Sequence, residues 1–159
     1  MKIRVGLGYD VHPLKEGTDF WLGGVKIEHP KGAVGHSDAD TLIHAMCDAF
    51  LGAANLGDIG LHFPNTSEEF KGIDSKKLLK KVAEMLKKEG YEIGNVDCTV
   101  SLESPKISPY IPEMKKILAE TLKIPLKNVS IKATTTEHLG FVGREEGVCA
   151  YAICLLMGY

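Results

Sequence analysis

The sequence lacks an apolar run long enough to cross a membrane, and it is poor in aromatic residues. Its longest apolar run, Val148–Met157, is about half as long as a membrane-spanning helix requires. Aromatic residues make up 7% of the 159 residues and the formal net charge is −2, which argues against a nucleic-acid partner. The first residues, MKIRVG, do not form the apolar core of a signal peptide. We therefore expect a cytoplasmic protein without a membrane or nucleic-acid partner.

The sequence also contains no Cys-x-x-Cys pair, no internal repeat, no low-complexity tract and no linker. Apolar residues make up 44% and charged residues 25%, as in ordinary globular proteins. We expect a single domain over residues 1–159, because this length supports one substantial core. The cysteines lie in apolar stretches and are expected to stay reduced in that core; they are Cys47, Cys98, Cys149 and Cys154.

Hydrophobic periodicity predicts a mixture of strands and helices. Ile3, Val5 and Leu7 alternate with polar residues and glycine, which is typical of a half-buried strand, and Gly23–Gly24 is typical of a hairpin turn. The other predicted elements are a helix capped by Ser37 or Asp38 and reaching Ala53, a loop over 55–67, a helix from Asp74 or Ser75 to Gly90, a strand over 96–102, a helix opening at Ser108–Pro109, and strands over 129–133 and 148–157.

This order of elements predicts an α+β fold of two layers, with a mixed β-sheet covered by helices on one face and a ferredoxin-like character. The last predicted strand, Val148–Met157, is apolar on both of its faces. A strand of this kind is expected to be covered on both sides. We expect a neighbouring subunit to supply the second cover.

Acidic and histidine residues recur at spacings that bring them together. Asp10 and His12 are two residues apart in a predicted extended segment, so their side chains point to the same side. Asp40, His44 and Asp48 are spaced i, i+4, i+8 and share one face of the first helix. No lysine or arginine lies between positions 31 and 71 to neutralise these carboxylates.

A divalent cation is one explanation for acids and imidazoles on a mostly apolar helix, because burying unpaired carboxylates is costly. Aspartate and two imidazoles suit zinc, and three protein ligands leave an open position, which is typical of catalytic zinc. The alternative is a helix face that lies in water with a solvated acidic stripe. The spacing alone leaves both interpretations open.

Two other segments are suited to phosphate. KATTTEHLG (132–140) offers three threonine hydroxyls and backbone amides to phosphoryl oxygens, with Glu137 as a possible ligand of a harder cation such as magnesium. SPKISPYIP places Lys106 before a helix N-terminus, where anions bind. The plainer interpretations are a threonine-rich strand end and an ordinary helix entry. Arg144, Glu145 and Glu146 are by default a solvated charge cluster.

Five segments together resemble one known family. GYDVHPL, GHSDADTLIHAMCDAFLGAANLGDIGLHFP, FKGIDS, GNVDCTV and IKATTTEHLGFVGREEG are similar, in order and over essentially the whole chain, to the 2-C-methyl-D-erythritol 2,4-cyclodiphosphate synthases. This family closes a cyclic diphosphate in the non-mevalonate route to isoprenoid precursors. The resemblance implies that the substrate is CDP-methylerythritol 2-phosphate. Its 2-phosphate would attack the β-phosphorus and CMP would leave.

The resemblance also implies a role for individual residues. Zinc would be held by Asp10, His12 and His44, with Asp40 and Asp48 orienting His44. Glu137 would hold magnesium or manganese, while His36 and Thr135 would stabilise the transition state. Substrate would be bound by Ser37, Asp58, Ile59, Gly60, Phe63, Pro64, Asn65, Thr66, Ser67, Thr134, Thr136, Phe141 and Arg144, and cytidine by Leu102, Glu103, Ser104, Pro105, Lys106, Ile107 and Ser108.

The family's assembly is a homotrimer with its sheets around the axis and its sites between subunits. Phe141, Arg144 and Glu146 would then lie near an axial cavity that accepts an isoprenoid diphosphate. The chain departs from the family pattern at Asn65 and Ser67, which stand where many relatives have acids, and at LESPK, where many have AQxPK.

Two other functions remain open from the sequence. A metal-dependent phosphohydrolase would use the open metal position to activate water, and its product would be linear rather than cyclic. A nucleotide- or RNA-binding module would need exposed aromatic residues and a basic face, of which the composition shows little.

Overall fold

The computed structural model describes residues 1–159 and contains one five-stranded sheet and one small hairpin. The strands of the sheet lie in the order β4-β1-β7-β5-β6, and β2 pairs with β3. The strands are β1 (Lys2–Glu16), β2 (Phe20–Leu22), β3 (Val25–Ile27), β4 (Lys31–Ala33), β5 (Tyr91–Ser101), β6 (Val129–Thr134) and β7 (Gly147–Gly158). The helices are α1 (Thr41–Ala53), α2 (Ile59–His62), α3 (Ser75–Lys88), α4 (Ile111–Leu122) and α5 (Gly140–Gly143), with 3₁₀ turns at Glu68–Phe70, Ser108–Tyr110 and Leu126–Asn128.

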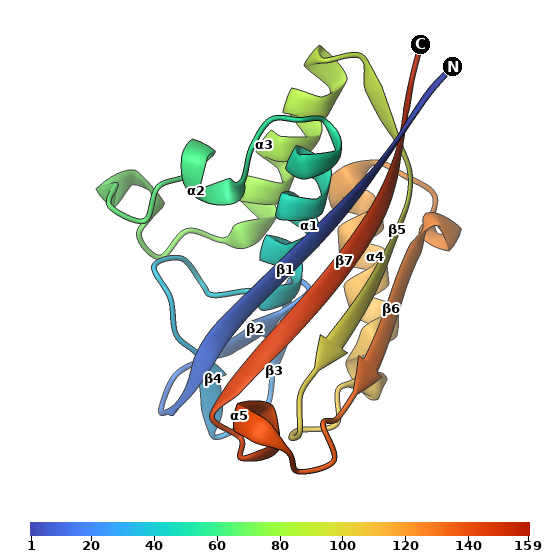
Figure 1. The fold of residues 1–159 in the computed structure, drawn as a ribbon. Helices are drawn as coiled ribbons and strands as arrows, with labels where there is room; N and C mark the ends of the chain where they lie inside the picture. The colour runs from blue at the N-terminus through green and yellow to red at the C-terminus, as the bar shows by residue number, and fades with distance from the viewer.

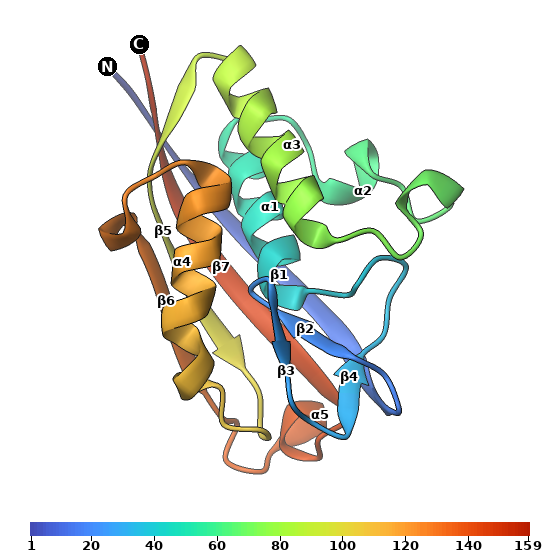
Figure 2. The same ribbon diagram turned by 180° about the vertical axis from the view of Figure 1, so that it is seen from behind.

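The sheet is mixed and its helices lie on one face, which confirms the predicted α+β fold of two layers. β1 pairs antiparallel with β7, β7 pairs antiparallel with β5, and β5 pairs parallel with β6. Helices α1, α3 and α4 lie side by side over this sheet, as Figure 2 shows, and the two chain ends meet at one end of β1 and β7 (Figure 1). No helix combines the length and the apolar character needed to cross a membrane.

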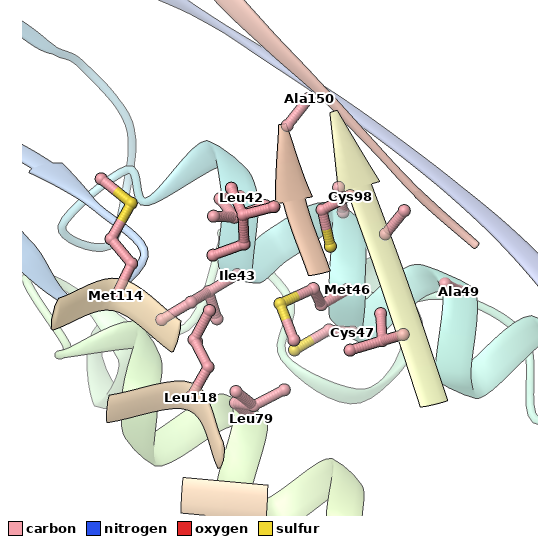
Figure 3. Packing of buried hydrophobic residues seen from close by; sticks show 14 of the residues in the cluster. Leu42, Ile43, Met46, Cys47, Ala49, Leu79, Cys98, Met114, Leu118 and Ala150 are labelled. Atoms are coloured by element: carbon pink, nitrogen blue, oxygen red, sulfur yellow. The ribbon is translucent and has the colours of Figure 1, made fainter. Parts of the chain in front are cut away.

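The core lies between the sheet and the helices, and α1 is at its centre. Ten of the thirteen residues of α1 are buried, because the helix is covered by the sheet on one side and by α3 on another. Figure 3 shows Leu42, Ile43 and Met46 of α1 packed among Leu79 of α3 and Leu118 of α4. All four cysteines are free and buried, as predicted.

Strand β1 is half-buried, but its apolar side chains lie on the open face of the sheet. Ile3, Val5 and Leu7 are 63%, 68% and 66% exposed, so the apolar positions of this alternating strand are the ones that face away from the helices. The buried face of β1 carries Gly6 and Gly8 instead, which touch the backbone of α1. The close approach of strand and helix, rather than hydrophobicity, decides which face is covered.

The open face of the sheet continues across β7. Tyr151 and Ile153 are exposed there, next to Tyr9 and Leu7 of β1. The predicted cover over β7 on this side is therefore not supplied by the chain itself. A continuous apolar face of this kind marks a contact surface for another molecule.

Two predicted boundaries differ from the structure. Helix α1 is capped by Asp40, whose side chain accepts a hydrogen bond from the Ile43 N–H, and not by Ser37 or Asp38. The predicted loop over 55–67 contains the short helix α2, which Asp58 caps through the Leu61 N–H. The second predicted helix does begin as expected, with Asp74 as its N-cap.

The contact between β1 and α1 can be tested at Gly8. A Cβ atom there would lie 1.8 Å from the Ala45 carbonyl oxygen, so the helix would have to move away from the sheet. We expect Gly8→Ala to lower the free energy of unfolding by ~2–3 kcal/mol, measured by denaturant titration at fixed protein concentration. Gly52→Ala is the control in the same helix, because nothing lies within 4 Å of its Cβ position; it is expected to stabilise by ~0.5–1 kcal/mol. An unchanged midpoint for Gly8→Ala would contradict the packing argument.

Candidate functional site

Three potential metal ligands converge where α1 crosses β1. Asp10 and His12 project from the same side of β1, and His44 projects from α1 toward them. Asp10 Oδ2 lies 2.9 Å from His12 Nε2 and 3.3 Å from His44 Nδ1, and the two imidazole nitrogens are 3.2 Å apart. Ligand atoms of a tetrahedral zinc with bonds of about 2.0–2.1 Å lie roughly 3.3 Å from one another. The spacing of the three atoms therefore fits a shared zinc ion.

The hydrogen bonds around the cluster leave it without a proton donor of its own. His12 Nδ1 lies 3.1 Å from the Val34 carbonyl oxygen, which can only accept, so Nδ1 carries the proton and Nε2 presents its lone pair. Asp10 Oδ2 is buried and has no hydrogen-bond donor. Buried acceptors without a donor are costly. A cation at their meeting point removes that cost.

The electrostatics of the metal-free cluster agree with this arrangement. Burial disfavours the charge of Asp10, but the two neighbouring imidazoles outweigh it and lower the pKa of Asp10. Burial likewise disfavours charge on His12, but Asp10 and the Val34 carbonyl raise the pKa of His12. The cluster thus attracts positive charge, as a proton or as a metal ion.

The cluster opens into a cavity of about 400 Å³. The cavity is lined by many residues predicted to bind substrate and by no lysine or arginine. Asp58 and Ser67 are absent from the lining. Asp58 instead caps α2, and the Ser67 carbonyl oxygen accepts a hydrogen bond of 2.8 Å from His36 Nε2. The predicted residues in the lining are Asp10, His12, His36, Ser37, His44, Ile59, Gly60, Phe63, Pro64, Asn65 and Thr66.

A second cluster brings together the two segments that were predicted to bind phosphate and cytidine. The Leu102 N–H donates to the Thr134 carbonyl oxygen at 3.0 Å, and the Thr136 N–H donates to Glu103 Oε2 at 3.2 Å. Glu103 also pairs with His138 at 3.0 Å. Glu137 and His138 both adopt left-handed backbone conformations, with φ of 54° and 62°. Such conformations in residues other than glycine concentrate at functional sites.

The two clusters do not meet within the chain. None of the residues 102–108 or 134–137 lines the metal cavity. Val11 of β1 and Ser101 of β5 both pair with Cys149 of β7, on opposite sides of it. Two strand spacings of about 4.8 Å therefore separate β1, which carries Asp10 and His12, from β5, which leads into the second cluster.

Asp40 does not orient His44, which corrects the role predicted for it, and Asp48 makes no hydrogen bond to His44. Both Asp40 oxygens are bound by backbone N–H groups, from Gly23 at 2.9 Å, Gly24 at 2.7 Å and Ile43 at 3.0 Å. Asp48 accepts from the Ile59 N–H at 2.7 Å, and burial raises its pKa. Helical spacing placed both acids near His44, but each anchors a backbone segment instead.

The contacts of His44 Nε2 come from residues that the sequence did not single out for this role. His44 Nε2 lies 2.9 Å from Ser75 Oγ and 3.1 Å from Ser37 Oγ. Ser75 belongs to the segment FKGIDS, which was noted without a function. A serine at the start of a helix looks like an ordinary cap, so its contact with a distant histidine has no local signal.

The residues predicted at the axial cavity lie at the end of β7. Arg144 Nε pairs with Glu146 Oε1 at 2.7 Å, and both side chains are exposed. Phe141 on α5 is partly exposed nearby. Within the chain these residues form a solvated pair beside an aromatic ring.

Comparisons with known proteins point to one family. Residues 3–157 match the model of the YgbB family. A relative from Cytophaga hutchinsonii, named 2-C-methyl-D-erythritol 2,4-cyclodiphosphate synthase, is 60% identical over 157 residues, or 99% of each chain. The bifunctional IspDF from Campylobacter jejuni aligns with a TM-score of 0.96 at 40% identity, covering 99% of this chain and 43% of that one. The CDP complex of IspF from Plasmodium falciparum aligns with a TM-score of 0.87 at 35% identity, covering 98% and 96%.

Zinc binding at the three-residue cluster can be tested through stability. At about a hundredfold excess over its dissociation constant, zinc is expected to stabilise the metal-free protein by about 2.7 kcal/mol, which for a chain of this size is roughly 5–10 °C in Tm. His44→Ala should lose this shift, because one of three ligands is gone. His29→Ala is the control, since His29 lies outside the cluster and packs against Phe20. A full zinc shift in His44→Ala, measured by calorimetry, would contradict the site.

Proposed function

The chain belongs to the YgbB family, and on that premise we propose how its two clusters divide the work of a cyclisation. The chain forms 2-C-methyl-D-erythritol 2,4-cyclodiphosphate and CMP from 4-diphosphocytidyl-2-C-methyl-D-erythritol 2-phosphate, a step of isoprenoid precursor biosynthesis. The 2-phosphate attacks the β-phosphorus, and a new phosphorus–oxygen bond closes the ring. The bond between the β-phosphorus and the bridging oxygen breaks, so that CMP leaves.

The convergence of three ligand atoms on the wall of the cavity carries this proposal. Asp10, His12 and His44 would hold zinc, and their donor types and spacing fit that ion. When bound, the zinc supplies a Lewis acid that polarises a phosphoryl oxygen. Because the cavity has no lysine or arginine, metal ions are the available source of positive charge for a substrate with three phosphoryl groups.

His36 and Ser37 are proposed to hold the phosphates over the metal cluster. Both line the cavity, and the Nε2–H of His36 already donates to a carbonyl oxygen of the opposite loop, at Ser67. A donor in this position can turn to a phosphoryl oxygen as negative charge develops there. Ile59 and Gly60, anchored to α1 through Asp48, would bind the methylerythritol part.

The nucleotide and the diphosphate are proposed to lie on the second cluster. Residues 102–108 would hold cytidine, Thr134, Thr135 and Thr136 would bind diphosphate oxygens, and Glu137 would bind magnesium or manganese. Thr135 would also stabilise the transition state. The strained backbone at Glu137 supports a functional role for this loop.

We propose that a neighbouring subunit completes the site in a homotrimer. The metal cavity and the nucleotide loops are separate within one chain, although one substrate must contact both. The exposed apolar face of β1 and β7 offers the contact surface, and a second copy of the same sheet is its natural partner. Phe141, Arg144 and Glu146 would then lie near the trimer axis and could receive an isoprenoid diphosphate. A cytoplasmic location agrees with the four free cysteines.

The reaction can be followed directly by phosphorus NMR. Purified protein with zinc, magnesium and the CDP-methylerythritol 2-phosphate substrate is expected to yield CMP and a cyclic diphosphate in equal amounts. A phosphohydrolase at the same metal cluster would release CMP with a linear product. Linear product in place of the cyclic one would overturn the proposed function.

Glu137 can be tested separately from zinc. Glu137→Gln is expected to keep one zinc per chain and to raise the magnesium concentration needed for half-maximal rate by about tenfold or more, because a neutral amide is a weaker ligand for a hard cation. Zinc content by atomic absorption and a magnesium titration of the initial rate measure the two effects. Glu113→Gln on α4 is the matched control. An unchanged magnesium titration would contradict the assignment.

A further inference from the structure

Two polar side chains, Ser75 and Asp38, lie on the side of His44 that faces away from the other two metal ligands. Ser75, the first residue of α3, is fully buried, and its Oγ lies 2.9 Å from His44 Nε2. The same Oγ lies 2.5 Å from Asp38 Oδ1, and the Ser75 N–H donates to Asp38 Oδ2 at 3.0 Å. Asp38 thus accepts hydrogen bonds from both donors of Ser75, the hydroxyl and the backbone N–H.

These contacts fix the position of each proton. The carboxylate of Asp38 can only accept, so the Ser75 hydroxyl donates its single proton to Asp38. The Ser75 oxygen then has only lone pairs to offer to His44. The proton in this contact must therefore belong to His44 Nε2, and His44 Nδ1 is left with a free lone pair. Nδ1 is the atom that lies 3.3 Å from Asp10 Oδ2 and 3.2 Å from His12 Nε2.

We propose that Asp38 and Ser75 form a positioning relay that fixes the proton of His44 on Nε2 and aims Nδ1 at the metal. The inference rests on the zinc site of the proposed function. Metal-bound histidines commonly donate their other ring N–H to a carboxylate or carbonyl group, and loss of that partner weakens metal binding. Here a serine hydroxyl stands between the imidazole and the carboxylate.

The relay is rigid because α3 and the loop before α1 are tied together at several points. The Asp38 N–H donates to the Ile73 carbonyl oxygen at 3.1 Å, and the Gly72 N–H donates to the His36 carbonyl oxygen at 2.7 Å. Asp38 also lies at the N-terminal end of α3, where the helix dipole favours its negative charge. The loop that carries His36 and the metal ligand His44 therefore share one hydrogen-bond network.

The relay also assigns the proton of Ser37. Ser37 Oγ lies 3.1 Å from His44 Nε2 and accepts from the Ala39 N–H at 3.2 Å. Because Nε2 already carries a proton, it cannot accept one from Ser37. The Ser37 hydroxyl proton is left free to point into the cavity, where it can donate to a phosphoryl oxygen.

Zinc affinity of Ser75→Ala tests the relay without reference to turnover. We expect the dissociation constant for zinc, measured by competition with a chromophoric chelator, to rise by roughly 10–100-fold. Asp38→Asn keeps an acceptor oxygen for the Ser75 hydroxyl and is expected to show a smaller rise. Asp74→Ala is the matched control, because it removes the cap of the same helix, a hydrogen bond to the Lys76 N–H, without touching the relay. It should bind zinc as the wild-type chain does.

A second measurement reports the position of the His44 proton directly. Nitrogen NMR of the metal-free wild-type protein, labelled in histidine, is expected to show His44 protonated on Nε2 at neutral pH. Ser75→Ala should instead populate both tautomers. Zinc affinity in folded Ser75→Ala within twofold of wild type, or a wild-type His44 proton on Nδ1, would overturn the relay. Because both readouts are independent of the cyclic product, the relay and the proposed reaction fail or succeed separately.

Discussion

The close contact between β1 and α1 is the constraint on which the site depends. Gly8 lies against the backbone of Ala45. On the strand, Gly8 stands two residues before Asp10, and on the helix, Ala45 directly follows His44. No side chain separates the two backbones at this point, so ligands from both elements reach one position. The same contact turns the apolar side chains of β1 to the open face of the sheet. The contact between β1 and α1 thus accounts for both the metal cluster and the exposed apolar face of β1.

The chemistry of the cavity follows from its charge. The lining holds one carboxylate and three imidazoles but no lysine or arginine, so the protein itself supplies little fixed positive charge to a highly anionic substrate. Metal ions bring that charge only when bound. The protein's contribution is to hold ligands, donors and loops in place, which suits an intramolecular phosphoryl transfer that depends on positioning.

The sequence predicted the layers and most of the elements, because these depend on local periodicity, and the family resemblance completed the set of three converging ligands. Alternation brought Asp10 and His12 to one side, and the family resemblance added His44. Spacing did not distinguish an aspartate that caps a helix from one that supports a histidine, so the role of Asp40 was wrong. The contact between Ser75 and His44 joins residues 31 positions apart, and no local pattern encodes it. Alternation likewise did not reveal which face of β1 is covered, because that face is defined by a tertiary contact at Gly6 and Gly8.

The two chain ends lie together (Figure 1), with Lys2 of β1 paired with Gly158 of β7. Asp10 and His12 lie toward the opposite end of the same strand pair, opposite Ala150 and Val148. Additional polypeptide attached at either terminus would leave from the end of the β1–β7 pair that lies away from Asp10 and His12. The bifunctional protein from Campylobacter jejuni, of which this chain covers 43%, shows that the fold occurs within a longer polypeptide. A short peptide joining the present ends, with new ends opened in a surface loop, would preserve the central strand pair and give a permuted enzyme with the same architecture.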